Sequence, residues 1–261
     1  MLIEIKKELR KYASKERKKS NEWFFKTGRG EYGEGDIFIG VRVLNIRKVV
    51  KKFSEVDLRI LEQLLYSKIH EERLLALLIL VSQNKQAVKQ GDKQIQKNIV
   101  TFYLKHKRQI NNWDLVDLSA HYILGQAILD ELYAEKILDK MVASANLWER
   151  RIGIIATWII IREGKIDTTL RLSKKLLADK EDLMHKAVGW MLREAWKLGE
   201  SNKKQDFSEA RLLQNRKGKK SQEQIEQFLI KNYNKLPRTT LRYAIERMPE
   251  QKRKRFLKGK F

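Results

Sequence analysis

Long stretches without proline are the feature that most constrains how this chain can fold. The 261 residues contain only two prolines, Pro237 and Pro249, and 34% of the residues are charged. Proline fixes φ and removes a backbone donor, so its scarcity leaves long segments free to be helical. A chain of this length can bury a substantial core, as one elongated unit or as two small domains.

Helical spacing of apolar residues recurs along the chain, at steps of three and four. The segments are 71–83, 112–129, 147–164, 181–199 and 221–233. Caps are expected at several of their ends, from Asn111 or Asn112, Gly164 and Gly199. The one alternating segment, 37–43, is short and flanked by glycine. The pattern therefore predicts an all-α chain.

Similar apolar runs begin at Arg73, Asp114, Arg150 and Lys186, at spacings of 41, 36 and 36 residues. Such a period with two helices per repeat is typical of HEAT-like helical repeats. Stacked helix pairs curve and form a concave groove, and a basic groove of this kind suits a nucleic-acid duplex. We expect a single domain over residues 1–261.

The formal net charge is +23, and residues 203–261 hold 18 Lys/Arg against 6 Asp/Glu. Such a surplus attracts polyanions, although a solubilising surface is the alternative. Six tryptophans and eight tyrosines favour a nucleic-acid partner, because aromatic rings stack on bases. The basic stretch 202–220 is expected to be a loop, or a loop with a short helix.

Several classes of protein are disfavoured by what the sequence lacks. It has no cysteine, so disulfides are excluded and a reducing compartment is plausible, and its four histidines lack metal-ligand spacing. No apolar run reaches the roughly 18 residues of a membrane span, and no signal peptide is expected. We expect a soluble, cytoplasmic protein.

A glycine-rich segment at 24–42 contains five of the thirteen glycines and matches G-x-G-x-x-G from Gly28 to Gly33. That pattern indicates a dinucleotide site only between a strand and a helix, and the preceding residues are charged and helix-periodic. We therefore expect no nucleotide cofactor, and interpret 19–36 as a loop between the first helix and the next.

Two candidate site residues lie in the segment that begins at Asn111. A helix starting near Trp113 places Trp113, Asp117 and His121 above one another, beside an apolar stripe. The stripe consists of Val116, Ala120, Ile123 and Ala127. Asp117 is then expected at the margin of the buried face, next to an indole. Asp114 fits better as a first-turn acid that favours the helix dipole.

Two adjacent arginines are further candidates for a functional site, and three tryptophans are weighed against a role in the core. Arg150 and Arg151 diverge by about 100° on a helix, so at most one can face the centre of a groove. Phosphate binding suits that arginine, and pairing with a surface acid is the alternative. Trp190 is expected to be a core residue, because most tryptophans in such helices are, and the same is expected of Trp158 and Trp196.

The chain resembles the bacterial alkylpurine DNA glycosylases of the DNA alkylation repair family. The resemblance rests on five colinear blocks between about residues 20 and 256: WFFKTGRGEYGEGDIFIGVRVLNIRKV, NNWDLVD, LWERRIGIIATW, GWMLREAW and PRTTLRYAIERMPEQKR. It implies a fold of HEAT-like repeats and excision of N3- or N7-alkylated purines from duplex DNA, without metal or other cofactor. Leu44 departs from the family's usual proline, and the basic 202–220 stretch is longer than usual.

The resemblance implies four site residues, and the matched blocks place them at Asp117, Trp113, Arg151 and Trp190. It also implies that the lesion stays stacked while the backbone is held. Further contacts to DNA are expected from Lys26, Tyr32, Arg42, Arg47, Arg150, Arg238 and Thr239.

The implied chemistry suits these residues. An alkylated purine is already cationic and leaves readily, so no strong general acid is needed. A carboxylate can stabilise the oxocarbenium-like sugar and orient water, and tryptophan faces attract the cation. We therefore expect a monomeric DNA glycosylase. The alternatives are a non-catalytic binder of damaged or structured DNA and, less favoured, an adaptor for acidic protein segments.

Overall fold

The computed structural model describes the backbone of residues 1–200 and 209–261 and the side chains of 1–200 and 218–261. All regular elements in this part of the chain are helical, apart from one isolated parallel bridge between Ile37 and Ile69. The predicted all-α fold is confirmed. The chain divides into two compact units, 1–127 and 128–261. The expectation of a single domain stays a prediction.

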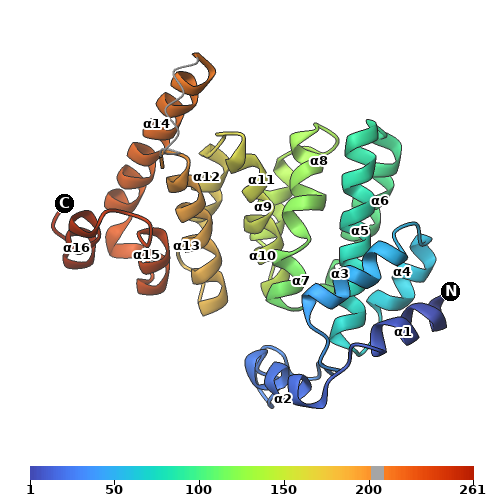
Figure 1. The fold of residues 1–261 in the computed structure, drawn as a ribbon. Helices are drawn as coiled ribbons and strands as arrows, with labels where there is room; N and C mark the ends of the chain where they lie inside the picture. Colours follow the sequence, from blue (N-terminus) through green and yellow to red (C-terminus); the bar gives the residue numbers. More distant parts are fainter. Residues whose placement is uncertain (201–208) are drawn as a thin grey trace. The chain divides into compact units, whose positions relative to one another are not determined.

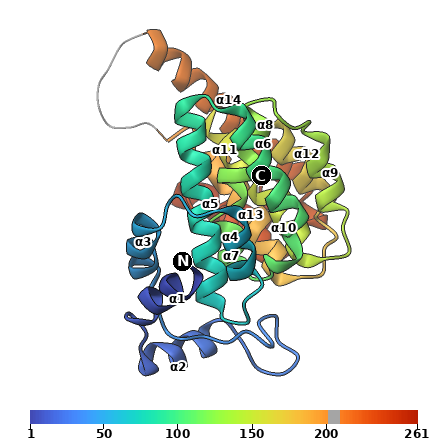
Figure 2. The same ribbon diagram turned by 90° about the vertical axis from the view of Figure 1, so that its right-hand side faces the viewer.

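Unit 1 (residues 1–127) is organised around one long helix. Its elements are α1 (Leu2–Arg10), α2 (Lys15–Phe24), α3 (Val43–Lys52), α4 (Leu58–Leu65), α5 (His70–Gln90), α6 (Lys93–Lys105), a 3-10 turn (Lys107–Gln109), α7 (Trp113–Asp117) and a π-helix (His121–Gly125), followed by α8 (Gln126–Leu129) at the boundary. Helix α5 packs against α3, α4 and α6, and the ribbon shows α5 and α6 side by side (Figures 1 and 2).

The first three turns of α5 are enclosed by protein. Every residue from His70 to Val81 is buried, including the charged residues Glu71, Glu72 and Arg73. Charged groups are removed from water only when they are paired or hydrogen-bonded. Glu72 accordingly lies within 2.8 Å of Lys6 and 2.9 Å of Arg10, both on α1. These ion pairs attach the first helix to α5.

The interpretation of residues 19–36 as a loop is wrong for its first six residues. Helix α2 begins after Ser14, whose hydroxyl accepts from the amide of Arg17, and it continues to Phe24. Its apolar residues at the C-terminal end, Trp23 and Phe24, are exposed. An exposed helix of this kind has no buried stripe, so helical periodicity gives little indication of it.

Gly40 closes the glycine-rich segment against the start of α2. Its φ is +79°, and a Cβ atom there would lie 2.1 Å from the carbonyl oxygen of Ser14. Gly30 has nearly the same φ, +78°, but nothing lies within 4 Å of its Cβ position. Both positions favour glycine for their backbone conformation. Only Gly40 also allows a close approach of two backbone segments.

This pair gives a matched test of the close approach. We expect Gly30→Ala to lower the free energy of unfolding by about 1 kcal/mol, the cost of the left-handed conformation. Gly40→Ala should lower it by a further 1–3 kcal/mol or so, because the added methyl group also meets the Ser14 carbonyl. Urea unfolding of both variants checks this. Equal losses would show that the contact at Gly40 relaxes without cost.

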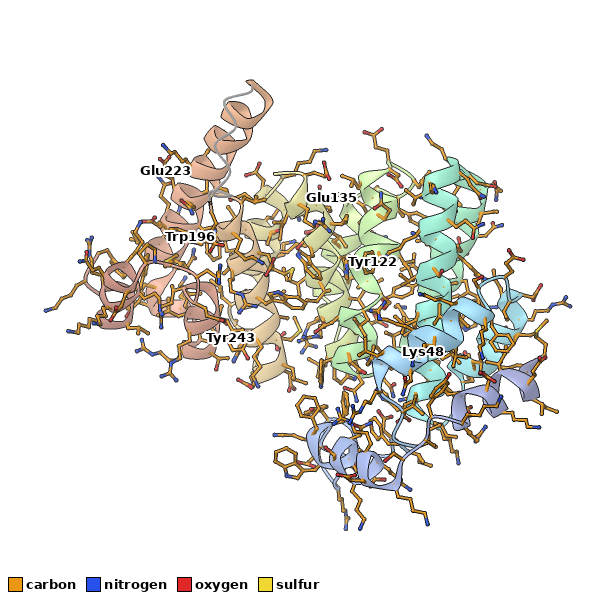
Figure 3. The ribbon with its side chains drawn as sticks, viewed as in Figure 1. Lys48, Tyr122, Glu135, Trp196, Glu223 and Tyr243 are labelled. Carbon is orange, nitrogen blue, oxygen red and sulfur yellow. The ribbon has the colours of Figure 1, made fainter. Side chains whose placement is uncertain are left out.

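The predicted helix at 112–129 is interrupted. Helix α7 ends at Asp117, and the backbone becomes π-helical from His121 to Gly125. The carbonyl of Tyr122, labelled in Figure 3, accepts from Asn84 of α5 at 2.7 Å. The Tyr122 ring lies under the Lys85 ammonium, which is 3.6 Å from its centroid. The expected regular stacking therefore extends from Trp113 to Asp117 but not to His121.

The apolar stripe of this region is confirmed. Val116, Ala120 and Ile123 are fully buried, and Ala127 is 1% exposed. Asp117 lies at the margin of the stripe and is half-buried. The buried stripe and the half-buried Asp117 beside it therefore lie where helical spacing predicts them.

Unit 2 (residues 128–261) consists of paired helices. Its elements are α9 (Lys136–Val142), α10 (Leu147–Ile155), α11 (Thr157–Arg162), α12 (Asp167–Lys175), α13 (Asp182–Lys197), α14 (Glu209–Lys231), a 3-10 turn (Tyr233–Lys235), α15 (Arg238–Ala244) and α16 (Glu250–Lys258). Helix α9 packs on α10, and α13 packs on α10, α12, α14 and α15. The expected single helix at 147–164 is two helices joined at Ala156.

Gly189 allows a close pairing of α13 with α15. A Cβ atom at Gly189 would lie 2.5 Å from Cβ of Tyr243, labelled in Figure 3, and 2.7 Å from the carbonyl oxygen of Thr240. A larger residue would separate the helices. The glycine of the GWMLREAW block is therefore explained by packing.

The basic stretch 202–220 is helical where the structure describes it. Helix α14 begins at Glu209 and continues without a break to Lys231, so it replaces both the expected short helix and the helix expected at 221–233. Residues 202–208 lie outside the described residues. The runs at Arg73, Arg150 and Lys186 all lie on helices that pack against the preceding helix, which is compatible with a stack of helix pairs. The HEAT-like class itself stays a prediction.

Candidate functional site

Helix α7 holds two of the four candidate residues. Asn112 is fully buried and begins the helix, with its side-chain oxygen 2.8 Å from the amide nitrogen of Trp113. The cap predicted from the sequence is therefore Asn112. Trp113 and Asp117 follow at the two ends of α7, four residues apart and both partly exposed. Residues at this spacing lie on one side of a helix.

An aromatic cluster supports the Trp113 indole. Its ring is stacked on Phe25, with centroids 5.1 Å apart and planes at 15°, and meets the edge of Phe24 at 5.7 Å. Phe25 also stacks on the buried Phe38 at 5.0 Å. Trp23 precedes this cluster in the chain and is 83% exposed. The cluster thus holds the Trp113 indole at the surface of unit 1. The highly exposed Trp23 indole lies one residue before Phe24 in the sequence.

Asp117 is half-buried, and its charge acts on a buried phenol, that of Tyr103. Tyr103 is fully buried, and its hydroxyl is 3.0 Å from Oγ of Ser119. Burial raises the pKa of Tyr103, and the negative charge of Asp117 raises it further. The Asp117 carboxylate is therefore close enough to act electrostatically on the Tyr103 hydroxyl.

A buried charged cluster lies behind α7, and sequence reasoning missed it. His70 stands between two carboxylates, with Nδ1 3.0 Å from Oδ2 of Asp36 and Nε2 2.8 Å from Oδ2 of Asp114. Asp36 also accepts from Arg73 at 2.6 Å and from the Asn112 amide at 3.1 Å. We call these five residues the buried polar cluster. Asp114 is thus a buried partner of His70 as well as a first-turn acid.

Electrostatics in the buried polar cluster follow from these contacts. Burial alone would lower the pKa of His70, but the charge of Asp114 and hydrogen bonds to Asp114 and Asp36 raise it to about 9. Burial would raise the pKa of Asp36, but the hydrogen bond from His70 and the charge of Arg73 hold it below the usual value. His70 is therefore charged at neutral pH.

A second buried acid holds the glycine-rich segment. Glu71 is 2% exposed, and its carboxylate accepts from the backbone amides of Ile39, Gly40 and Val41 at 3.0, 2.8 and 3.2 Å. The segment is thus attached to α5 at its C-terminal end. At its other end Phe25 packs on Trp113. The segment connects the start of α5 with the start of α7.

The geometry of this segment argues against a phosphate cradle. The amide of Gly28 donates to the Glu31 carboxylate at 3.0 Å, and the amide of Gly30 donates to Glu34 at 2.8 Å. These are the amides that a nucleotide phosphate would need. Both are bonded to negative side chains. No group of three possible metal-ligating side chains occurs among the residues that the structure describes.

The other two candidates lie in unit 2. Arg151, on α10, is 5% exposed and donates from its guanidinium to the carbonyl of Leu183. Trp190, on α13, is half-buried, donates from Nε1 to Glu194 at 3.1 Å, and contacts Trp158 at 5.1 Å. Two of the four candidates therefore lie in each unit.

Three expectations for this region have different outcomes. Trp196 is a core residue as predicted, at 3% exposure. Trp158 was predicted to be core and is instead half-buried against Trp190. Arg150 is bound to Asp179 at 2.6 and 3.2 Å and to the carbonyls of Ser144 and Ala145. Its guanidinium is occupied within unit 2, and its contact with DNA stays a prediction.

The remaining residues expected at DNA are at the surface of their units. Lys26, Arg42 and Arg47 are exposed in unit 1, as is Arg238 in unit 2. Half-buried Tyr32 donates to the carbonyl of Phe24 at 3.4 Å. Half-buried Thr239 donates to Asp182 at 3.1 Å. Their exposure is compatible with binding, and their contacts with DNA stay predictions.

Comparison with known proteins identifies the family. A family model described as DNA alkylation repair enzyme matches residues 5–207, more than three quarters of the chain. A comparison with curated protein sequences gives no match. No helix in the described part of the chain is long and apolar enough to cross a membrane. With α7, the buried polar cluster and four of the five blocks wholly inside the matched region, the chain belongs to the DNA alkylation repair enzyme family.

Proposed function

We propose that this protein is a DNA glycosylase that hydrolyses the N-glycosidic bond of cationic N3- or N7-alkylated purines in duplex DNA. The observation that carries the proposal is the arrangement of α7. One short helix presents an indole and a carboxylate four residues apart, both partly exposed, on a buried and hydrogen-bonded base. Membership of the DNA alkylation repair enzyme family supports a role in DNA repair.

The reaction follows from the charge of the substrate. As the bond between C1′ and the purine breaks, the bonding electrons neutralise the cationic base and leave positive charge on the sugar. Asp117 stabilises that charge and orients the water that attacks C1′. The proton from the water passes to Asp117 or to solvent, and the products are a neutral free base and an abasic site.

The aromatic and basic residues have supporting roles in the proposal. Trp113 offers the face of its indole to the cationic nucleotide, and Trp190 is proposed to do the same. Arg151 is 5% exposed, so we propose that it acts through its charge on an approaching phosphate rather than as an exposed clamp. A charge acts more strongly through a medium of low dielectric constant. Because indole faces at a surface need no deep pocket, we further propose that the lesion stays stacked.

Release of free base from methylated duplex DNA tests the proposed function. We expect the native protein to release N3-methyladenine or N7-methylguanine faster than the DNA loses them unaided, and to release nothing from unmethylated duplex. Chromatography of the ethanol-soluble fraction measures the bases. DNA that is bound at low salt without any release would contradict catalysis on methyl lesions. It would favour the rival function, a non-catalytic binder of damaged or structured DNA.

A further inference from the structure

The ring nitrogens of His70 both face carboxylate oxygens, at 3.0 Å to Asp36 and 2.8 Å to Asp114. An ionised carboxylate only accepts hydrogen bonds, and a neutral imidazole has one donor and one acceptor. A neutral His70 could therefore satisfy one aspartate, and its lone pair would face the other. Only the imidazolium donates to both.

The surroundings of the ring also suit a cation. Phe38 stacks on the imidazole at 4.5 Å with planes at 24°, and Phe25 lies at 5.0 Å. Aromatic faces attract a cation and exclude water. The charged groups around His70 are Asp36 from the segment before α3, Asp114 from α7, and Arg73 from its own helix, so two acids balance two cations. Glu71 and Glu72 bind elsewhere.

Both aspartates connect His70 to the start of α7. Asp114 accepts from His70 through Oδ2 and from the amide of Leu115 through Oδ1 at 2.8 Å. Asp36 accepts from His70 and from Asn112, the residue that caps Trp113. The Trp113 ring also rests on Phe25, which contacts His70. Each route from His70 to the start of α7 is thus a short series of direct contacts.

We propose that protonated His70 is a positioning residue that holds α7 in the geometry in which Trp113 and Asp117 act. The inference rests on the proposed function for its consequence in catalysis, but not for the conformational effect. His70 does not touch the substrate. When it loses its proton, one of the two aspartates loses its hydrogen bond from His70, and the first turn of α7 is released on that side.

The direction of the pH effect follows from the raised pKa. The folded value is about 9 against an ordinary value of 6.5. The stabilisation of this folded geometry by His70 is therefore complete below about pH 6.5, and it is lost as the pH rises through about 9. We expect the rate of base release to fall through the same range, with little change in the protein concentration that gives half the maximal rate.

Asp114→Asn provides the matched variant. The asparagine oxygen can still accept from Leu115, and its amide can donate to Nε2 of a neutral His70, whose Nδ1 then donates to Asp36. The network is thereby satisfied without charge on the imidazole. We expect the midpoint of His70 to fall by at least one pH unit in this variant and the decline in rate near pH 9 to disappear. His70→Gln, which can donate to only one aspartate with good geometry, should be slow at every pH.

Three measurements on the full chain test the proposal between pH 6 and 10. The imidazole resonances report the midpoint of His70, assigned among four histidines with His70→Gln. Fluorine spectra of protein containing 5-fluorotryptophan report Trp113, assigned with Trp113→Phe. Single-turnover release from methylated duplex, corrected for release without protein, reports catalysis.

The outcomes separate the inference from the proposed function. A Trp113 resonance that changes with the midpoint of His70 in the native protein, and not near pH 9 in Asp114→Asn, supports positioning. A His70 midpoint below pH 7.5, or a Trp113 resonance that does not change while His70 titrates, overturns it. If no base is released at any pH while Trp113 follows His70, the glycosylase proposal fails and the conformational coupling stands.

Discussion

Replacing Asp117 by asparagine is expected to reduce the rate of base release by about 10²- to 10³-fold, the usual effect of removing one electrostatic stabiliser of a transition state. The variant keeps the size of the side chain and its place at the end of α7, but loses the negative charge that opposes the developing charge on the sugar. Affinity for DNA should stay the same or increase slightly, because a carboxylate that repels phosphates has been removed.

The comparison needs a variant with the same change in charge. Glu55→Gln provides it, since Glu55 is exposed in unit 1 outside any helix. Single-turnover release at saturating protein, together with binding to the same duplex, should show a large loss for Asp117→Asn and none for Glu55→Gln. A rate within fivefold of the native rate in Asp117→Asn would remove the carboxylate from the mechanism and leave the indoles and the basic surface to explain any activity.

Replacing Glu71 by glutamine is expected to lower the free energy of unfolding by about 2–3 kcal/mol. Oε1 of Glu71 accepts from Gly40 and Val41, and Oε2 accepts from Ile39. The amide group of glutamine has one oxygen, so at least one buried backbone N–H loses its acceptor and faces another donor. Bonds to a charged acceptor also become bonds to a neutral one, which are weaker.

Two measurements distinguish a local effect from a general one. Urea unfolding gives the total loss, for which Glu55→Gln again serves as the control. Hydrogen exchange at the amides of residues 39–41 should accelerate more than exchange in the centre of α5, because the segment separates from the helix before the unit unfolds. If the stability of Glu71→Gln lies within about 0.5 kcal/mol of the control, within the range of ordinary surface changes, the buried carboxylate contributes little.

The helices could be predicted where one face is apolar and the other polar. Segment 181–199 satisfies this rule and is a single helix in the structure, and segment 71–83 is part of a single helix although it is buried on all sides. The segment 112–129 also satisfies it, yet the chain changes to a π-helix at His121. One additional residue in a turn leaves nearly the same apolar spacing, so periodicity does not detect it. Helix α2 was partly missed for the opposite reason, since it has no apolar stripe.

The candidate site was only partly accessible from the sequence. Asn112 as a cap and the half-buried position of Asp117 followed from local spacing, which acts within a few residues. The buried polar cluster joins Asp36, His70 and Asp114, which are 34 and 44 residues apart along the chain. The charged run that begins at His70 resembles a solvated helix face. The burial of this run depends on residues 36–41, which bind the start of α5, and no local sequence pattern indicates such a distant contact.

The attachment of the glycine-rich segment has a consequence for how this protein can diverge. Glu71 binds residues 39–41 through their backbone amides alone. Asp36 is the one residue of the segment that belongs to the buried polar cluster. Between Thr27 and Gly35 most side chains are exposed. The exceptions that restrict substitution are glycines: Gly33 is buried, with its Cβ position 2.3 Å from the Phe25 carbonyl oxygen, and Gly30 and Gly35 have positive φ. At the exposed positions other than these glycines, such as Arg29, substitutions leave the attachment to α5 intact. Under the proposed function, this segment is a place where contacts with DNA can change while α7 stays as it is.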